Sequence, residues 1–379
     1  MRGLTIARRL RQHQFLFVCA DDAVSVLAPE FPVHQIPNLG TIFRDYKVDI
    51  PATVRHSLPL LMNREKYIRE LVDLIHAFGP DVCMTDLEYF VPRAAERTNI
   101  PCLTLDHQHV ITCCRHHLPS NMWWDTMVQG LTPKYLFRPT AQNLIVSFYA
   151  PPVLSKYNAR VVPPILREQV LAAVPEDKGH VVVYQSNSTS PALIEFLQKA
   201  TKRTCYVFGY RQEEGRSRNV VFMKKSEEGF LRLLSSCSYV IQGGSHTLMT
   251  EALYLGKPIF TIPLKAMVEQ RFNALYIDRL KYGMQADMEQ LKPSQLYIFE
   301  GNLEIYRQNI ARGHFCGNET VFGLVDAFIR TGTLPQSGEP RVLEKAEQAT
   351  LRIGSPEETL AAWYSAEDRD KAKKKQRRS

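Results

Sequence analysis

The chain has 379 residues, a formal net charge of +8 and a pI near 9.0, with 45% hydrophobic and 23% charged residues. This composition is normal for a soluble globular enzyme, and the length exceeds one ordinary core, so two domains are expected. The sequence contains no apolar run that would span a membrane, and the basic N-terminus lacks the apolar core of a secretory signal.

In the first half, short apolar runs alternate with amphipathic stretches, which is typical of βαβ units around a parallel sheet. The chain opens on a helical pattern, where a domain of this class is expected to open on a strand and a glycine-rich turn. A second helix is predicted over 67–78, ended by Gly79 and Pro80. The predicted strands of this half are 15–20, 81–86, 101–106 and 143–148.

The second half begins a new set of apolar runs after a proline-rich segment that resists regular structure. Its predicted strands are 180–185, 205–209, 219–223, 238–242 and 258–263. We therefore predict an N-terminal domain of residues 1–160, a linker of 161–178 and a C-terminal domain of 179–330. The remainder, 331–379, is predicted to hold short helices at 341–351 and 357–366 and a disordered basic tail.

The eight cysteines are scattered and form no CxxC pair. Four lie in apolar runs and are interpreted as small core residues in a reducing, cytoplasmic compartment: Cys19, Cys83, Cys102 and Cys205. No second ligand cluster accompanies Cys113 and Cys114, so no metal site is predicted. The net positive charge favours anionic binding partners. Nucleic acid is not expected, because no aromatic-basic interleaving occurs, whereas the tail at 371–379 is expected to contact an anionic membrane surface.

A glycine-rich turn follows the strand predicted at 238–242, and a helical pattern follows the turn as far as Gly256. A strand, a glycine-rich turn and a helix can hold a phosphate, because free N–H groups and the helix dipole favour an anion. An ordinary βα turn with a serine N-cap is the alternative. The candidate phosphate-binding residues are Gly243, Gly244, Ser245, His246 and Thr247.

Three further side chains extend this candidate site. Glu251 lies on an otherwise apolar helix face, where a carboxylate needs hydrogen-bond donors such as a ribose diol, unless it points to solvent. Glu269 and Gln270 follow the next strand, and a carboxylate beside an amide suits the hydroxyls of a hexose. Taken alone, this pair is also compatible with a solvated helix start.

The stretch from Gly243 to Leu280 resembles the donor-binding region of GT-B glycosyltransferases, including the peptidoglycan N-acetylglucosaminyltransferase and the UDP-glucuronosyl and macrolide enzymes. The resemblance implies an α/β fold of two Rossmann-like domains facing across a cleft. It assigns diphosphate to residues 244–247, ribose to Glu251 and sugar to Glu269 with Gln270. Many plant and mammalian relatives have Asp where this chain has Glu269, which leaves the sugar open.

Most of the chain resembles a prokaryotic glycosyltransferase-like group, some of it linked to teichoic-acid synthesis. In that group the helix similar to residues 1–10 follows a strand and a glycine-histidine loop, so the first domain is expected to lack both elements. The resemblance covers about residues 1–335, and the donor motif is its most specific part.

Polar residues at the carboxyl ends of two strands of the first domain are the candidate bases, because such positions face the ligand in open α/β sheets. They are Asp86, Glu88, Asp106 and His109. A group of apolar residues at 122–127 is compatible either with an apolar acceptor such as a lipid carrier or with core packing.

These observations predict an inverting, metal-independent glycosyltransferase with no cofactor beyond its nucleotide-sugar donor, a UDP-sugar being favoured. The expected acceptor is an unidentified glycan or lipid-linked hydroxyl, in cell-envelope glycan or glycolipid synthesis at the inner face of the membrane. The alternatives are a sugar-nucleotide epimerase or hydrolase on the same fold, or an inactive sugar-nucleotide-binding protein.

Overall fold

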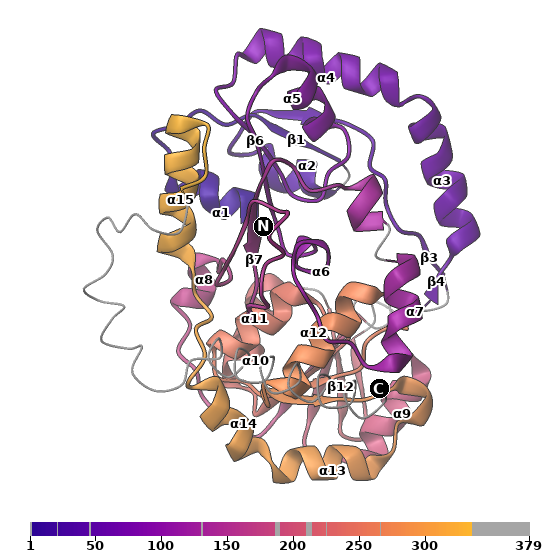
Figure 1. The fold of residues 1–379 in the computed structure, drawn as a ribbon. Helices are drawn as coiled ribbons and strands as arrows, with labels where there is room; N and C mark the ends of the chain where they lie inside the picture. Colours follow the sequence, from indigo (N-terminus) through magenta and orange to yellow (C-terminus); the bar gives the residue numbers. More distant parts are fainter. Residues whose placement is uncertain are drawn as a thin grey trace, which may run out of the picture.

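A computed structural model describes residues 2–20, 22–44, 47–129, 132–185, 190–209, 214–224, 226–265 and 267–335. The predicted helices at 341–351 and 357–366 and the basic tail lie outside the described residues. The chain forms an upper and a lower α/β half in Figure 1. Across the described part of the chain, no helix has the length and apolarity needed to cross a membrane.

The described residues of the first half and of the connection that follows it form seventeen elements. They are α1 (Arg2–Arg9), β1 (Phe17–Cys19), α2 (Asp22–Leu27), β2 (Val33–Gln35), β3 (Phe43–Arg44), β4 (Lys47–Val48), α3 (Ile50–Met62), α4 (Arg64–Phe78), β5 (Cys83–Thr85), α5 (Val91–Thr98), β6 (Cys102–Asp106), α6 (His109–Cys113), α7 (Ser120–Gln129), the π-helical turn η1 (Thr132–Leu136), β7 (Gln142–Val146), β8 (Ala159–Val162) and α8 (Glu168–Leu171).

The first half is built on a parallel sheet of order β5-β6-β7-β8, with β1 and β2 as a separate parallel pair. All four strands predicted here are confirmed, and as predicted the first described element is a helix, α1. The predicted helix at 67–78 is confirmed as α4, which ends at Gly79 in the left-handed conformation. That positive φ suits a residue without a Cβ. The sheet brings the carboxyl ends of β5 and β6 together, where the candidate bases lie.

The second half contains the remaining elements. They are β9 (Val181–Tyr184), α9 (Pro191–Ala200), β10 (Cys205–Phe208), β11 (Gly215–Ser217), β12 (Val220–Met223), α10 (Glu227–Ser236), β13 (Tyr239–Gln242), α11 (His246–Tyr254), β14 (Ile259–Thr261), α12 (Val268–Arg279), β15 (Gly283–Gln285), the 3₁₀ turn η3 (Met288–Gln290), α13 (Pro293–Gly301), α14 (Leu303–Ile310) and α15 (Asn318–Thr331).

The second sheet has the order β11-β12-β10-β9-β13-β14-β15 and is parallel except for β11. The five strands predicted in this half are confirmed as β9, β10, β12, β13 and β14. Because β13 and β14 are parallel neighbours, the loops after Gln242 and Thr261 leave the sheet at the same edge. The glycine-rich turn and the Glu269-Gln270 pair are therefore close in space.

The last described helix returns to the first half of the molecule. Val321, Val325 and Phe328 of α15 are fully buried in one apolar cluster with Leu103 of β6 and Leu144 of β7. In Figure 1, α15 stands beside the upper half rather than the lower one. The sequence-predicted C-terminal domain thus contains a helix that packs on the sheet of the N-terminal half.

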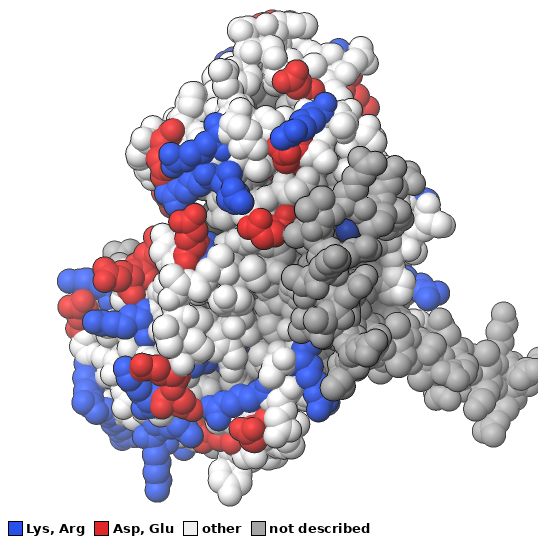
Figure 2. Space-filling model, turned by 90° about the vertical axis from the view of Figure 1, so that its left-hand side faces the viewer, with Lys and Arg blue, Asp and Glu red and all other residues white. Residues whose placement is uncertain are grey.

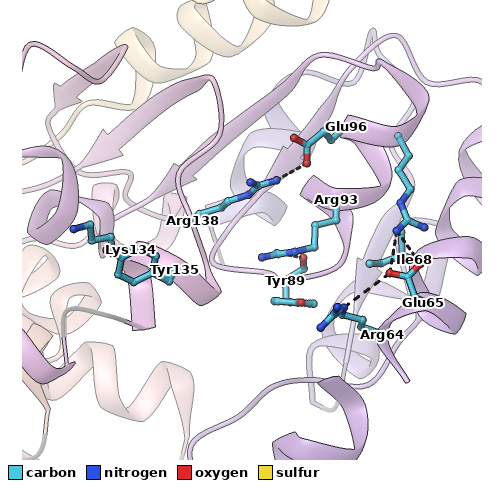
Figure 3. Close-up of a pocket in the computed structure, with 10 residues that line it drawn as sticks. Arg64, Glu65, Ile68, Tyr89, Arg93, Glu96, Lys134, Tyr135 and Arg138 are labelled. Atoms are coloured by element: carbon cyan, nitrogen blue, oxygen red, sulfur yellow. Dashed lines mark hydrogen bonds and ion pairs between the residues drawn. The ribbon is translucent and has the colours of Figure 1, made fainter. Parts of the chain in front are cut away.

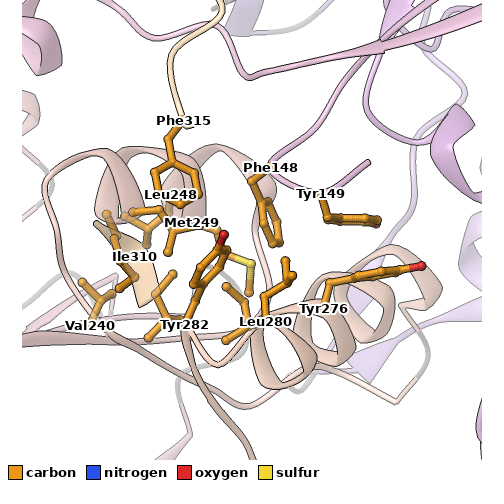
Figure 4. Close-up of a cluster of buried hydrophobic side chains, with 14 of the residues drawn as sticks. Phe148, Tyr149, Val240, Leu248, Met249, Tyr276, Leu280, Tyr282, Ile310 and Phe315 are labelled. Atoms are coloured by element: carbon orange, nitrogen blue, oxygen red, sulfur yellow. The ribbon is translucent and has the colours of Figure 1, made fainter. Parts of the chain in front are cut away.

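An apolar cluster joins the two halves beneath the candidate site. Phe148 and Tyr149, which follow β7, belong to the same buried cluster as Met249 of α11 and Tyr276 of α12. Figure 4 shows Phe148 directed toward Met249, and the rings of Tyr149 and Tyr276 stack with 3.8 Å between their centroids. This contact places the strand ends of the first sheet against the glycine-rich turn of the second.

Candidate active site

The glycine-rich turn lies where β13 passes into α11, and its first donors are already occupied. Oε1 of the buried Gln242 accepts hydrogen bonds from the N–H groups of Gly244 (3.1 Å) and Ser245 (2.9 Å). Gly243 is buried, and Thr247 is exposed. Ser245 is the N-cap of α11, whose first N–H groups have no partner within the helix. The helix start, more than the glycines themselves, can therefore donate to an anion.

Gly244 is required by its conformation and by its neighbours. Its φ is +105°, and a Cβ there would lie 2.7 Å from Cβ of Gln270 and 2.8 Å from its carbonyl oxygen. Nδ2 of the buried Asn273 donates to the Gly244 carbonyl at 3.0 Å. The turn is thus held against the start of α12, which brings the Glu269-Gln270 pair to it.

Glu251 is buried on α11, and an arginine from the connecting segment pairs with both of its oxygens. Nε and Nη2 of Arg167 donate to Oε1 and Oε2 of Glu251 at 2.8 and 3.1 Å. The Glu251 side chain is 8% exposed, so the solvent-facing alternative does not describe it. Nη1 of the same arginine contacts the exposed Glu227. A carboxylate has about four lone-pair sites, so two remain for hydroxyl donors.

The Glu269-Gln270 pair begins α12 and contacts both halves of the molecule. Oε2 of Glu269 accepts a hydrogen bond of 2.5 Å from Nε2 of Gln108 in the first half. Burial raises the pKa of Glu269, and the Gln108 hydrogen bond opposes that shift. Oε1 of Gln270 accepts from the N–H of Leu264 at 3.0 Å, which holds the preceding loop.

Two stacked histidines join the strand end of the first sheet to the turn of the second. The rings of His107 and His246 stack with 3.6 Å between centroids, and Phe148 lies 5.9 Å from His246. His107 is hydrogen-bonded to Asn273 Oδ1 and to the Val146 carbonyl. Within the described structure, Nε2 of His246 is buried without a hydrogen-bond partner. A phosphate oxygen would satisfy that nitrogen.

Asp106 and His109, two of the candidate bases, form a buried pair. Nδ1 of His109 lies 2.6 Å from Oδ2 of Asp106, and its backbone N–H donates to Oδ1. Nε2 of His109 lies 2.7 Å from the Phe137 carbonyl. Burial alone would raise the pKa of Asp106, but the His109 interactions hold it below its usual value. With both ring nitrogens engaged, His109 has no open lone pair for an incoming proton.

Asp86 and Glu88 follow β5 and have different surroundings. Both oxygens of Asp86 accept from Arg2 of α1, at 2.7 and 3.0 Å, and the Asp86 side chain remains 46% exposed. Glu88 accepts from the N–H groups of Phe90 (2.8 Å) and Val91 (2.5 Å) at the start of α5. The Glu88 carboxylate therefore caps a helix, whereas Asp86 stays open to an incoming group.

Several contributing residues were not singled out by sequence reasoning. Nothing in the sequence marks Arg167 as a site residue, because it lies in the proline-rich segment and contacts Glu251 only in the folded protein. Gln242 was treated as the last residue of a strand, although its side chain closes the turn. Gln108 lies between the candidate bases Asp106 and His109, and its contact with Glu269 spans the two halves.

The stacked histidines predict that acid destabilises the fold. Burial lowers the pKa of His107 to about 4 and that of His246 well below its ordinary value of 6.5. Their unfolded forms bind protons near pH 6.5, so the unfolded state binds more protons between pH 6.5 and about 4. Stability contributed by the neutral rings is therefore complete above pH 6.5 and is lost as the pH falls toward 4.

Urea denaturation measured across this pH range checks the prediction. The unfolding free energy of the wild type should fall with pH more steeply than that of a His107→Gln variant, because glutamine does not titrate. Equal slopes for the two proteins would show that His107 does not contribute.

Comparison with known proteins identifies the family of this chain and solved structures with a similar fold. The sequence model described as glycosyl transferase family 1 matches residues 2–303. The fold is similar to that of Os79 from O. sativa in complex with U2F and trichothecene (14% identity, TM-score 0.61, covering 87% of this chain and 96% of that one). No sequence of a curated protein matches the chain.

Two further solved structures have the same fold. One is Arabidopsis thaliana UGT89C1 complexed with UDP-L-rhamnose (14% identity, TM-score 0.56, covering 87% of this chain and 91% of that one). The other is Acinetobacter baumannii MurG (16% identity, TM-score 0.54, covering 86% and 95%). The predicted GT-B architecture is thereby confirmed.

Proposed function

Because the chain belongs to glycosyl transferase family 1 and is a glycosyltransferase of the GT-B fold, we propose that it transfers a hexose or N-acetylhexosamine from a nucleotide-diphosphate sugar to an acceptor hydroxyl. The observation that carries this proposal is the buried site at the start of α11. There the helix N-terminus, the buried Glu251 and a His246 Nε2 that has no hydrogen-bond partner among the described residues occur on consecutive turns. UGT89C1 is described with UDP-L-rhamnose, and we favour a UDP-sugar here too.

In the proposed arrangement, diphosphate binds at the first turn of α11, where N–H groups and His246 face it. Glu251 accepts the ribose hydroxyls with the lone pairs that Arg167 leaves free. Glu269 and Gln270 bind the sugar, and the Gln108 contact aligns Glu269 from the opposite half.

The reaction we propose inverts the anomeric centre. The acceptor oxygen forms a bond to the sugar's anomeric carbon as the bond to diphosphate breaks, and a base takes the acceptor proton. Asp86 is paired with Arg2 but has the most exposed side chain of the candidate bases, whereas Asp106 and His109 are buried together and Glu88 caps a helix. Positive potential at α11, rather than a metal ion, stabilises the leaving diphosphate. Complete loss of activity in EDTA would contradict that last point.

Replacing Glu251 tests the donor site. Glu251→Gln should weaken UDP binding by about tenfold or more, since a charge-assisted hydrogen bond contributes about 1.5–3 kcal/mol. Isothermal titration calorimetry measures the change. Glu227→Gln is the matched control, because Glu227 pairs with the same arginine but its side chain is 61% exposed. If Glu251→Gln binds UDP as tightly as the wild type, the ribose role is wrong.

We further propose that the acceptor lies at a membrane surface, in cell-envelope glycan or glycolipid synthesis. An exposed apolar face of α3 supports this proposal. Ile50, Val54, Leu58 and Met62 recur every fourth residue along α3 and are 52–76% exposed. No residue of α3 is buried, and its sequence contains no acidic residue. Leu61 of α3 packs against the apolar cluster of the first half, but the exposed stripe has no such partner among the described residues, and the helix gains stability by placing the stripe in a lipid interface.

The apolar residues at 122–127 were compatible with core packing or with contact to an apolar acceptor, and they divide between a buried and an exposed position. Met122 is buried, whereas Trp123 and Met127 of α7 are 58% and 49% exposed. Both α3 and α7 lie on the right-hand flank in Figure 1. The opposite flank, in Figure 2, carries Lys and Arg interspersed with Asp and Glu, which suits contact with water.

Membrane binding can be tested with liposomes that contain phosphatidylglycerol. Leu58→Glu/Met62→Glu should lower binding by about tenfold or more, because two apolar side chains no longer enter the interface. Val174→Glu is the control, since Val174 is 74% exposed on the segment between the two halves. Equal binding by all three proteins would refute this surface. Deleting residues 371–379 tests the predicted tail contact separately.

A further inference from the structure

A basic cavity of about 540 Å³ lies in the first half of the molecule, between α4, α5 and η1. None of the candidate donor-binding or catalytic residues lines it. Five cationic side chains and two carboxylates do, which leaves an excess of positive charge. The cations are Arg64, Arg93, Arg97, Lys134 and Arg138, and the carboxylates are Glu65 and Glu96.

Both carboxylates form ion pairs with arginines that line the cavity. Glu65 lies 2.8 Å from Arg97 and 3.9 Å from Arg64, and Glu96 pairs with Arg138. Figure 3 shows these ion pairs on either side of Arg93. The pairs fix the positions of the guanidinium groups but do not neutralise the centre of the cavity.

Arg93 is the central group. Its Nη1 and Nη2 donate to the carbonyls of Tyr89 (2.6 Å) and Leu136 (3.1 Å), and its guanidinium carbon lies 3.6 Å from the centroid of the Tyr89 ring. Among the described residues, no carboxylate lies within ion-pair distance of Arg93 or of Lys134. Burial, together with the charge of Arg138, lowers the pKa of Arg93. A preorganised cation of this kind interacts favourably with an anion.

We propose that this cavity is a second anion site, which binds a phosphate group carried on a small organic ligand. Arg93 contacts the phosphate, Lys134 adds a positive charge to the lining of the same cavity, and the exposed ring of Tyr135 offers an apolar face to the attached group. The volume exceeds that of a lone phosphate. A sugar phosphate and a phospholipid headgroup share this chemistry, so the test distinguishes them. The proposal does not depend on glycosyl transfer.

The cavity is also connected to the candidate active site through the backbone. Arg93 bonds to the carbonyl of Leu136, and His109 bonds to the carbonyl of the next residue, Phe137. A ligand that moves Arg93 would therefore act on the segment that holds the Asp106–His109 pair.

Calorimetric titration of the full chain with glucose 1-phosphate tests the proposal. Arg93→Gln should weaken binding by about tenfold, because it removes a charge-assisted contact. Lys134→Gln should weaken binding by a smaller factor, because it removes one positive charge from the lining of the cavity. Lys134 is exposed, so its variant keeps the test valid if Arg93→Gln fails to fold. Arg216→Gln, at an exposed strand of the second half, is the matched control and should bind as the wild type does.

The second part of the experiment measures binding of the same proteins to vesicles that contain phosphatidic acid. Loss of vesicle binding in both variants, with glucose 1-phosphate binding unchanged or undetectable, assigns the site to a lipid headgroup. Affinities of both variants equal to wild type for both probes, or no binding of either probe by the wild type, would overturn the proposal. UDP titrated into the same samples separates the two sites, because these variants should bind UDP normally.

Discussion

A Gly244→Ala variant is expected to lose UDP binding and about 3 kcal/mol or more of stability. Two costs combine at this residue. An alanine at φ +105° is strained, and its Cβ would lie within 2.8 Å of the backbone of Gln270. Because Gln270 lies in the first turn of α12, relieving the clash moves Glu269 and Gln270 away from the glycine-rich turn. Urea denaturation and UDP calorimetry measure the two effects.

Gly256→Ala separates the two costs. Gly256 also has a positive φ, +72°, but a Cβ there would meet nothing within 4 Å. This control should lose only about 1 kcal/mol and keep UDP binding, because only backbone strain is added. If the two variants were equally stable and bound UDP equally, the packing of the turn against α12 would not matter.

The second large effect is expected at Arg167. Arg167→Met should destabilise the protein by about 3–5 kcal/mol, because it leaves the Glu251 carboxylate buried without its cation. UDP affinity should fall too, since nothing then orients that carboxylate. Denaturant titration of the purified variant measures the loss.

A second substitution shows whether the unpaired charge is the cause. Arg167→Met/Glu251→Met should recover most of the stability but not UDP binding, because the pair is replaced by apolar groups. Glu227→Gln should change stability by less than about 1 kcal/mol, as expected of an exposed pair. A single Arg167→Met variant as stable as the wild type would contradict the geometry at Glu251.

Nine strands of the two halves and the stretch that holds the candidate site could be predicted from the sequence, whereas β2, β3, β4, β8, β11 and β15 were not predicted. Buried parallel strands appear as continuous apolar runs, and the turn between β13 and α11 carries its glycines within a few residues of the strand. The burial of Glu251 followed in the same way, since a lone carboxylate on an apolar helix face needs a partner.

The contacts between segments that lie far apart in the sequence could not be predicted. The partner of Glu251 is an arginine from the linker, and the stack of His107 on His246 joins two halves that share no sequence pattern. The hydrogen bond of His109 to Phe137 likewise depends on how η1 folds back. The return of α15 to the first sheet depends on packing rather than on local periodicity.

A crystal structure of the protein with UDP shows whether the start of α11 is the donor site. We expect the β-phosphate at the first turn of α11, within hydrogen-bond distance of His246 Nε2, with the ribose hydroxyls on Glu251. Diphosphate bound elsewhere, for example at Arg93 with the start of α11 unliganded, would refute the proposed donor site.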